Sequence, residues 1–421
     1  MTLDLLRFTT AGSVDDGKST LIGRLLYDSK QVFEDQLAHV AQASERRGGE
    51  GTLDLALLTD GLRAEREQGI TIDVAYRYFA TARRRFIIAD CPGHRQYTRN
   101  MVTGASTADV SVVLIDARRG VLEQSKRHAF ISALLGIPEM VVAINKMDLV
   151  EYSQERYEEL VEEFEGFATK LTGVTNITYI PMSALEGDNV VSRSQEMPWY
   201  EGPVLLDLLE NVEVAYDHPD AKPARFPVQW VIRPGAGISD YRGYAGQLAS
   251  GALRRGDEVA VLPGGARTRI AAIDTYDGEL EEAMAPMSLP LRLEDEIDVS
   301  RGELICHPDR APVVGREFVA DICWMTDEPM RPGARYLIKH TSRSATAAID
   351  GIEDLLDVHT LERTDPPAGL ALNDIGRVRL RTSTPLAFDP YTSNRRTGSF
   401  ILIDESSNGT VGAGMIASAR A

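Results

Sequence analysis

Hydrophobic and polar positions divide the first half of the chain into two kinds of segment. One kind is short and largely apolar, as in strands buried on both faces of a parallel sheet, and occupies residues 5–11, 86–90, 110–116 and 140–144. The other kind has apolar side chains at helical spacing and occupies residues 19–26, 123–135 and the stretch after Ser153, a residue that is predicted to cap its helix. Strands that alternate with helices predict an α/β domain with a mostly parallel sheet.

The pattern changes after residue 212, where short strand-like runs are separated by glycine turns. They fall into two sets, the first at residues 228–232, 246–251 and 258–262, the second at residues 318–325, 336–340, 378–382 and 400–403. Such spacing is typical of closed β-barrels. We therefore predict a multidomain α/β plus β chain, with an α/β domain over residues 1–216 and β-barrel domains over residues 222–311 and 312–421.

A glycine-rich turn joins the first predicted strand to the first predicted helix. It has the G-x-x-x-x-G-K-S pattern of a phosphate-binding loop (P-loop), in the strand–loop–helix context that this motif requires. Backbone N–H groups and the helix N-terminus would hold the phosphates, Lys18 would reach the terminal phosphates, and the Ser19 hydroxyl would bind Mg²⁺. The predicted contacts are Gly12, Ser13, Val14, Asp15, Asp16, Gly17, Lys18, Ser19 and Thr20.

Two later segments suit recognition of Mg²⁺ and a γ-phosphate. Thr71 is predicted to lie in a switch segment, where its hydroxyl and backbone hold both groups. Asp90 ends a buried-type strand and is predicted to contact Mg²⁺, while the Gly93 N–H meets the γ-phosphate. His94 follows where a side chain is needed to orient the attacking water, because phosphoryl transfer depends on positioning and electrostatics. Cys91 is expected to pack behind this motif.

A third group of residues points to the base of the nucleotide. Asn145, Lys146 and Asp148 follow the strand at residues 140–144, at the carboxyl end where ligands bind such sheets. A carboxylate there can accept both N–H groups of guanine, a pair that adenine lacks, so the motif predicts GTP over ATP. Backbone N–H groups near guanine O6 are predicted to come from Ser183, Ala184 and Leu185.

Composition narrows the function classes further. The formal charge of −18 over 421 residues argues against a broad grip on nucleic acid. The three cysteines are too few for a disulfide framework or a zinc site, so we expect reduced thiols in the cytoplasm. We expect neither a signal peptide nor a membrane-spanning segment. His128, in the helix at residues 123–135, is interpreted as a surface or hydrogen-bonded histidine.

The chain resembles the translation-factor class of GTPases, in which a P-loop GTPase domain is followed by two β-barrel domains. Within that class it is most similar to the GTPase (large) subunits of bacterial sulfate adenylyltransferase, or ATP sulfurylase. The Asp15-Asp16 pair and the run GITIDVAYRY are much more specific than a general GTPase motif. The segments that carry the resemblance are residues 12–26, 53–78, 90–106, 183–189, 197–200, 242–246 and 295–302.

The resemblance implies GTP and GDP as ligands, Mg²⁺, and catalytic roles for Lys18, Thr71 and His94. It also implies a partner, a smaller catalytic subunit that condenses ATP with sulfate to adenosine 5′-phosphosulfate and diphosphate. The sequence agrees with that division of labour, because it contains no Ser-Gly-Gly-x-Asp-Ser adenylylation loop. Some family members carry a fused adenylylsulfate kinase, and we expect none within these 421 residues.

Two functions compatible with the five GTPase motifs stay open at this point. The first is a GTP-driven regulator of sulfate activation, and the second is a translation elongation factor that carries aminoacyl-tRNA. The Asp15-Asp16 pair and the run at residues 295–302, DEIDVSRG, favour the first. A stand-alone metabolic enzyme is disfavoured, because no second active-site pattern occurs.

Overall fold

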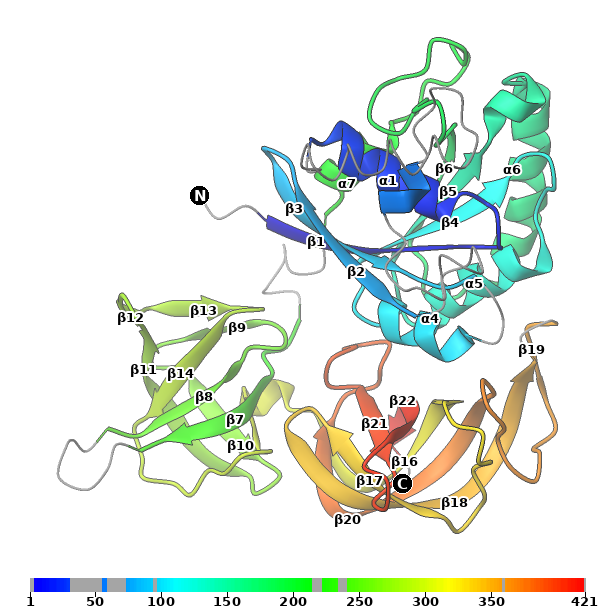
Figure 1. The fold of residues 1–421 in the computed structure, drawn as a ribbon. Helices are drawn as coiled ribbons and strands as arrows, with labels where there is room; N and C mark the ends of the chain where they lie inside the picture. The colour runs from blue at the N-terminus through cyan, green and yellow to red at the C-terminus, as the bar shows by residue number, and fades with distance from the viewer. Residues whose placement is uncertain are drawn as a thin grey trace. The chain divides into compact units, whose positions relative to one another are not determined.

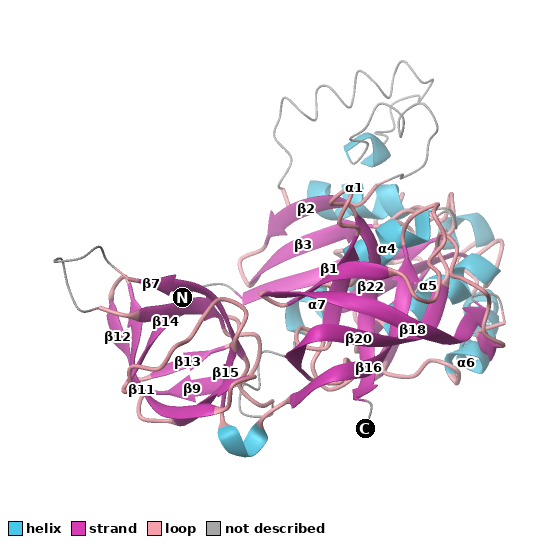
Figure 2. Cartoon of the chain, turned by 90° about the horizontal axis from the view of Figure 1, so that it is seen from below, coloured by secondary structure: helices cyan, strands magenta, loops and turns pink. Residues whose placement is uncertain are grey.

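The computed structural model describes residues 4–30, 55–58, 73–93, 97–213, 222–233, 241–357 and 360–419. The chain divides into two compact units, Met1–Val214 and Ala215–Ala421 (Figure 1). Helices gather on the first unit, whereas strands make up most of the second (Figure 2). The three domain boundaries expected from the sequence stay a prediction. Among the described residues, no helix combines the length and the apolar content that a membrane span requires.

The first unit is built on one mostly parallel sheet. Its strand order is β2 (Ala75–Ala80), β3 (Arg84–Asp90), β1 (Asp4–Gly12), β4 (Val110–Asp116), β5 (Glu139–Asn145) and β6 (Asn176–Pro181). Every neighbouring pair is parallel except β2 with β3. Every residue of β4 is buried, which explains its continuously apolar sequence. The predicted α/β class is confirmed.

Helices connect these strands and cover the sheet. They are α1 (Lys18–Asp28), α4 (Thr98–Ala105), α5 (Glu123–Leu134), α6 (Gln154–Ala168) and α7 (Leu205–Asn211). The predicted cap of α6 is confirmed, since the Ser153 hydroxyl accepts a hydrogen bond from the Arg156 N–H at 3.1 Å. A short 3₁₀ turn, Leu55–Leu58, precedes residues that lie outside the described part of the chain.

The antiparallel edge strand β2 was not among the predicted strands. Its first residue, Ala75, pairs with Asp90, and Phe79 stacks on Phe86 with ring centroids 4.4 Å apart. The hairpin places the segment before β2 and the segment after β3 at the same end of the sheet. The strand was missed because it is not continuously apolar: Arg77 takes a half-buried position, while Tyr76 and Tyr78 are exposed.

The second unit begins with a closed antiparallel barrel. Its ring runs β10 (Glu258–Leu262), β15 (Leu304–Cys306), β7 (Phe226–Ile232), β8 (Gly243–Gln247), β14 (Ser288–Leu293) and β11 (Ala266–Thr275), which pairs back with β10. The short strands outside the ring are β9 (Ala252–Arg254), β12 (Gly278–Leu280) and β13 (Glu282–Met284). The strand predicted at residues 246–251 is shifted, because the chain leaves β14 after Gln247 and Ser250 pairs with Arg225.

A second closed barrel follows, with longer and bulged strands. Its ring runs β17 (Arg335–His340), β21 (Ser399–Ile403), β22 (Thr410–Ala419), β16 (Val313–Trp324), β20 (Ile375–Phe388) and β18 (Arg343–Asp357), which pairs back with β17; β19 (Glu362–Thr364) extends β18. Phe318, Phe388 and Phe400 pack in its core. The two predicted barrels are therefore confirmed, while the 15 residues of β18 were not predicted as a strand.

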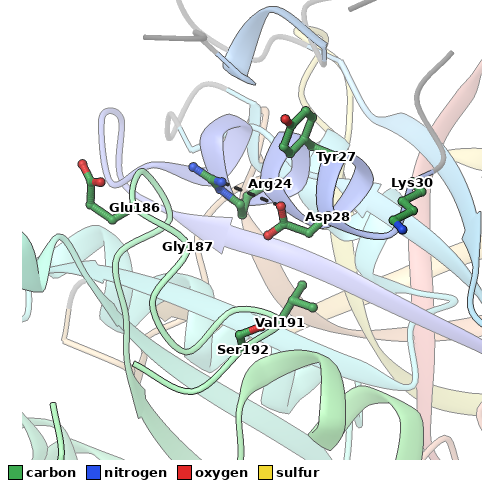
Figure 3. A pocket seen from close by; sticks show the side chains of 8 residues that line it. All are labelled: Arg24, Tyr27, Asp28, Lys30, Glu186, Gly187, Val191 and Ser192. Atoms are coloured by element: carbon green, nitrogen blue, oxygen red, sulfur yellow. Dashed lines mark ion pairs between the residues drawn. The ribbon is translucent and has the colours of Figure 1, made fainter. Parts of the chain in front are cut away.

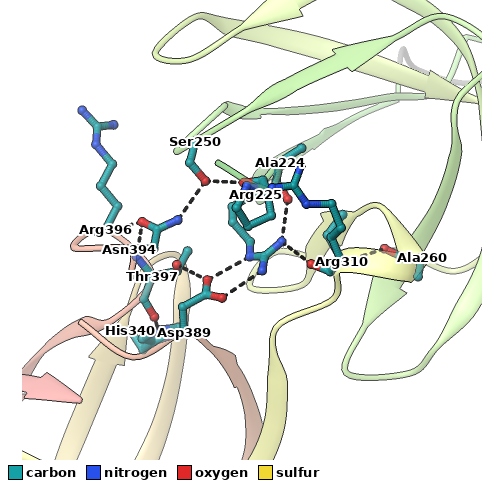
Figure 4. A network of polar contacts seen from close by, with 12 residues as sticks. Ala224, Arg225, Ser250, Ala260, Arg310, His340, Asp389, Asn394, Arg396 and Thr397 are labelled. Carbon is teal, nitrogen blue, oxygen red and sulfur yellow. Dashed lines mark hydrogen bonds and ion pairs between the residues drawn. The ribbon is translucent and has the colours of Figure 1, made fainter. Parts of the chain in front are cut away.

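Polar contacts join the two barrels within the second unit (Figure 4). The Arg225 guanidinium donates from Nε and Nη2 to the two carboxylate oxygens of Asp389, each at 2.8 Å. Asp389 also accepts from the Thr397 hydroxyl at 2.5 Å, and Arg225 donates to the Arg310 carbonyl at 2.9 Å. The Arg225 side chain is 2% exposed and that of Asp389 is 10% exposed, so water screens this ion pair little.

We expect Arg225→Met to lower the free energy of unfolding of the second unit by about 3–5 kcal/mol, because it leaves the Asp389 carboxylate buried without its partner. Urea unfolding of the whole chain, read by hydrogen exchange in β7 and β20, measures the change. Arg381→Met is the matched control, since it removes a more exposed pair with Asp350 at 3.2 Å and is expected to cost less than about 1 kcal/mol. Equal losses in both variants would contradict the prediction.

The sheet domain of the first unit and each of the two barrels have one buried cysteine. Cys91 follows β3 in the first unit, Cys306 ends β15 in the first barrel, and Cys323 lies in β16 of the second barrel. Burial raises the pKa of the Cys91 and Cys323 thiols to about 12 and that of Cys306 to about 11. All three are free thiols.

Candidate functional site

The predicted phosphate loop lies between β1 and α1 and is held by a hydrogen bond between two of its own residues. Gly17 caps α1 with φ +93°, a left-handed conformation that favours glycine. The Ser13 N–H donates to Asp16 Oδ2 at 2.6 Å, so the Asp16 side chain crosses the loop. Ser19 and Thr20 are the second and third residues of α1, where their N–H groups belong to the orphan donors of a helix N-terminus. The loop can therefore bind an anion.

The side chain of Lys18 turns back into the phosphate loop. Its Nζ donates to the carbonyl oxygens of Gly12 at 2.9 Å and Ser13 at 2.8 Å, and the residue is 7% exposed. Burial lowers the pKa of Lys18, although the carboxylates of Asp90 and Asp16 oppose that shift. The ammonium group is thus fixed at the mouth of the loop by backbone carbonyls, a position from which it can reach an anion.

Side-chain oxygen atoms from two neighbouring strands lie near this lysine. Asp90 ends β3 in direct register with Thr10 of β1, and the Thr10 hydroxyl donates to its Oδ1 at 3.4 Å. The Asp90 carboxylate and the Ser19 hydroxyl are hard oxygen groups of the kind that Mg²⁺ prefers as ligands. No cluster of three or more His, Cys, Asp or Glu side chains suited to a metal occurs in the described residues. A magnesium ion held partly by phosphate oxygens does not need such a cluster.

Gly93 lies directly against the phosphate loop. A Cβ atom at this position would lie 2.4 Å from the Gly12 carbonyl oxygen and 2.8 Å from Lys18 Nζ, so only glycine fits. The backbone of residue 93 is therefore close enough to share a ligand with the loop. Two predicted residues, Thr71 and His94, lie outside the described residues.

Asn145 joins the phosphate loop to the loop predicted to read the base. Its Nδ2 donates to the Asp16 carbonyl at 2.8 Å, and its Oδ1 accepts from the Ala184 N–H at 2.9 Å. Lys146, in a left-handed conformation with φ +65°, donates to the Asp15 carbonyl. Three sequence motifs, at residues 12–20, 145–148 and 183–185, thus form one site.

Asp148 and Ser183 are among the other residues that the sequence predicts to contact the base. Asp148 Oδ1 is buried and has no hydrogen-bond partner among the described residues. A buried carboxylate oxygen without a donor is costly, and a ligand N–H would remove that cost. Ser183 is fully buried, while Leu185 is 47% exposed beside it. These groups fit a base edge that presents N–H donors to Asp148.

Sequence reasoning missed the residues that hold Lys146 in place. Asp116, the last residue of β4, accepts from Lys146 Nζ at 3.0 Å and from Arg118 Nε at 3.0 Å and Nη2 at 2.7 Å. Burial alone would raise the pKa of Asp116, but the hydrogen bonds from Arg118 and Lys146 hold it below its usual range. The carboxylate stays charged and anchors Lys146. An aspartate at the end of a strand next to the motif was the available signal.

Of the predictions made for Cys91 and His128, the structure agrees with the first and contradicts the second. Cys91 packs behind the loop as expected, with its Sγ 3.0 Å from the Thr9 hydroxyl. His128 is 2% exposed, and its Nδ1 has no hydrogen-bond partner in the described part of the chain, so the interpretation as a surface or hydrogen-bonded residue was wrong. The reason is that α5 turns polar residues such as Ser125 and Ser132 inward as well.

Two family models match the chain. Residues 3–217 match the elongation factor Tu GTP binding domain, and residues 317–417 match the GTP-eEF1A C-terminal domain-like family. The first match covers the first unit and contains every residue of the candidate site. The second covers most of the second barrel.

Similar proteins extend over almost the whole chain. The bifunctional enzyme CysN/CysC of Mycobacterium tuberculosis is 58% identical over 98% of this chain and 67% of its own length. Sulfate adenylyltransferase subunit 1 of Bacteroides fragilis is 54% identical over 98% of this chain and 86% of its own length. The protein of the same name from Alteromonas mediterranea is 52% identical, over 98% and 87%.

Proposed function

Because the chain belongs to the family of sulfate adenylyltransferase subunit 1, within the translation-factor class of GTPases, we propose that it is the GTP-hydrolysing regulatory subunit of such an enzyme. The observation that carries the GTPase activity is the Asn145 bridge, which joins the phosphate loop to the base loop in one site. The sulfate adenylyltransferase assignment rests on relatives that are 52% to 58% identical. They support it over the elongation-factor alternative.

In this proposal the phosphate loop and Lys18 bind the phosphates of GTP or GDP. Asp148 accepts the N1–H and the 2-amino group of guanine, which the orphaned Oδ1 supports. Within residues 183–185, the N–H groups of Ser183 and Ala184 already donate to the Asp188 carbonyl and to Asn145 Oδ1, so the Leu185 N–H is assigned to guanine O6. Adenine would leave the Asp148 carboxylate unpaired and is therefore rejected.

Ser19, Thr71 and Asp90 would hold Mg²⁺. The ion would neutralise charge on the phosphates when bound. The Gly93 N–H is assigned to the γ-phosphate, supported by its close approach to Gly12 and Lys18. His94 is assigned, from its place in the motif, to the orientation of the attacking water.

The partner in this proposal is a smaller catalytic subunit in the cytoplasm. It would join ATP and sulfate to give adenosine 5′-phosphosulfate and diphosphate, a reaction that is steeply uphill. GTP hydrolysis can drive that synthesis only if the GTP and GDP states of this chain bind the partner differently. By linkage, the partner then changes the affinity of this chain for nucleotide.

We expect the chain alone to hydrolyse GTP slowly and to make no adenosine 5′-phosphosulfate. Adding the catalytic subunit, ATP and sulfate should raise GTP hydrolysis and product yield together. One reaction in which GDP and adenosine 5′-phosphosulfate are both measured tests this, with His94→Ala as the matched variant. That variant should keep its GTP affinity and lose turnover by on the order of tenfold or more.

Two outcomes would contradict the proposal. Equal product yield with the slow His94→Ala variant would show that GTP hydrolysis does not drive synthesis. Stimulation by aminoacyl-tRNA, with no response to the catalytic subunit, would favour the elongation-factor alternative.

A further inference from the structure

Arg24 connects the helix of the phosphate site to the loop of the base site. It lies in α1, whose first residues are Lys18 and Ser19, and its side chain is 18% exposed. Its Nε donates to the Ala184 carbonyl at 3.2 Å, and its Nη2 donates to the Leu185 carbonyl. The guanidinium thus binds two consecutive carbonyl groups of the segment assigned to guanine O6.

These two contacts fix the orientation of the peptide units in that loop. The Ala184 carbonyl and the Leu185 N–H belong to one planar peptide unit and point in opposite directions. An anchor on the carbonyl therefore also sets the direction of the N–H. The Ala184 N–H is held separately by Asn145 Oδ1 at 2.9 Å. Arg24 thus orients the Leu185 N–H, while the Ala184 N–H already donates to Asn145.

Neighbouring residues pack against the Arg24 side chain in the orientation that makes these two hydrogen bonds. The side chain borders a cavity of about 630 Å³ between the end of α1 and the loop at residues 186–192 (Figure 3). A Cβ atom on Gly187, which has φ +93°, would lie 3.6 Å from Cδ, Cζ and Nη1 of Arg24, so the loop packs along the guanidinium. On its other side, Nη1 lies 3.7 Å from Asp28 Oδ1. A lysine cannot reproduce such a planar fork.

We propose that Arg24 is a positioning residue for guanine recognition, which orients the O6-reading peptide units by holding the Ala184 and Leu185 carbonyls. This inference rests on the proposed function, because it takes residues 183–185 as the O6 contact. Arg24 acts through the loop backbone and does not touch the nucleotide. The same helix then positions both ends of GTP, the phosphates through Lys18 and the base through Arg24.

Three nucleoside diphosphates separate this role from a general effect on the fold. IDP keeps O6 but lacks the 2-amino group, and 6-thio-GDP changes only the O6 acceptor to a weaker one. Arg24→Met keeps a long side chain against Gly187 and removes both donors. We expect it to weaken GDP and IDP binding about tenfold, the effect of a misplaced hydrogen bond. Binding of 6-thio-GDP should change less than about twofold, because that contact is already weak.

The control variant is Asp28→Asn, which removes the ion pair of Arg24 and leaves both carbonyl contacts. It should bind all three nucleotides as the unaltered chain does. Competition against a fluorescent GDP gives the affinities, all with the full chain. If the unaltered chain does not prefer GDP to 6-thio-GDP, the O6 contact itself is wrong. If it does, but Arg24→Met weakens all three ligands equally or none, the role of Arg24 is overturned.

Discussion

Lys18→Ala is expected to reduce GTP affinity by on the order of a hundredfold or more, the usual effect of removing one partner of a buried, charged contact. The Lys18 ammonium is held at the loop mouth by the Gly12 and Ser13 carbonyls at 2.9 Å and 2.8 Å. Without it, the phosphates lose the cation that lies closest to them in the proposed site. Titration with GDP and with a non-hydrolysable GTP analogue measures the loss.

The matched control for Lys18 is a lysine elsewhere in the same unit. Lys126 on α5 has a side chain that is 36% exposed, and its Nζ lies 3.7 Å from Glu163 Oε1. Lys126→Ala should leave nucleotide affinity unchanged. Thermal unfolding without nucleotide checks that Lys18→Ala keeps its fold. A folded Lys18→Ala variant whose GTP affinity stays within about threefold of that of the unaltered chain would contradict the assignment of the phosphate loop as the binding site. A change of that size is smaller than the contribution of one neutral hydrogen bond.

Asp148→Asn is expected to invert the choice of base. Asparagine presents a donor where aspartate presents only acceptors, so guanine N–H groups lose their partner and the 2-oxo group of xanthine gains one. GTP affinity should fall by roughly two orders of magnitude, and xanthosine triphosphate should become the preferred ligand. The structural basis for an effect of this size is the buried Oδ1 of Asp148, for which the described ranges of the chain offer no hydrogen-bond partner.

Asp207→Asn makes the same chemical change on an exposed residue of α7 and serves as the control. It should alter neither affinity. The decisive measurement is the ratio of xanthosine triphosphate to GTP affinity in each variant. An Asp148→Asn protein that still prefers GTP would show that another group selects the base.

The parts of the site that the sequence predicted are those with short-range geometry. Lys18 contacts carbonyls five and six residues away, so the spacing of the motif already contains the contact. The same holds for the Ser153 cap of α6. Buried parallel strands such as β4 were visible because both of their faces are apolar. These features follow from the local chain, whatever packs around it.

The parts that the sequence did not predict depend on residues brought together by the fold. Arg24 contacts a carbonyl 161 residues away, and Asp116 reaches Lys146 across two neighbouring strands. An arginine on an amphipathic helix normally indicates a solvent-facing position. The prediction for His128 was wrong for the opposite reason. It assumed that the polar residues of a helix face solvent, whereas this helix buries several of them. Long bulged strands such as β18 also break the alternation of period two.

The three buried cysteines can report local opening of the native protein without any added label. Thiol reagents attack the thiolate, and burial raises the pKa of Cys91 and Cys323, which keeps both thiols protonated at pH 7. A cysteine introduced at the exposed residue Tyr276 would therefore take up a dye without removal of the native ones. The native thiols become reactive only when their own sheet opens. Cys91 directly follows β3 of the first unit, and Cys306 and Cys323 lie in the first and second barrels, so modification rates in increasing denaturant report the opening of these three regions separately, in the unaltered chain.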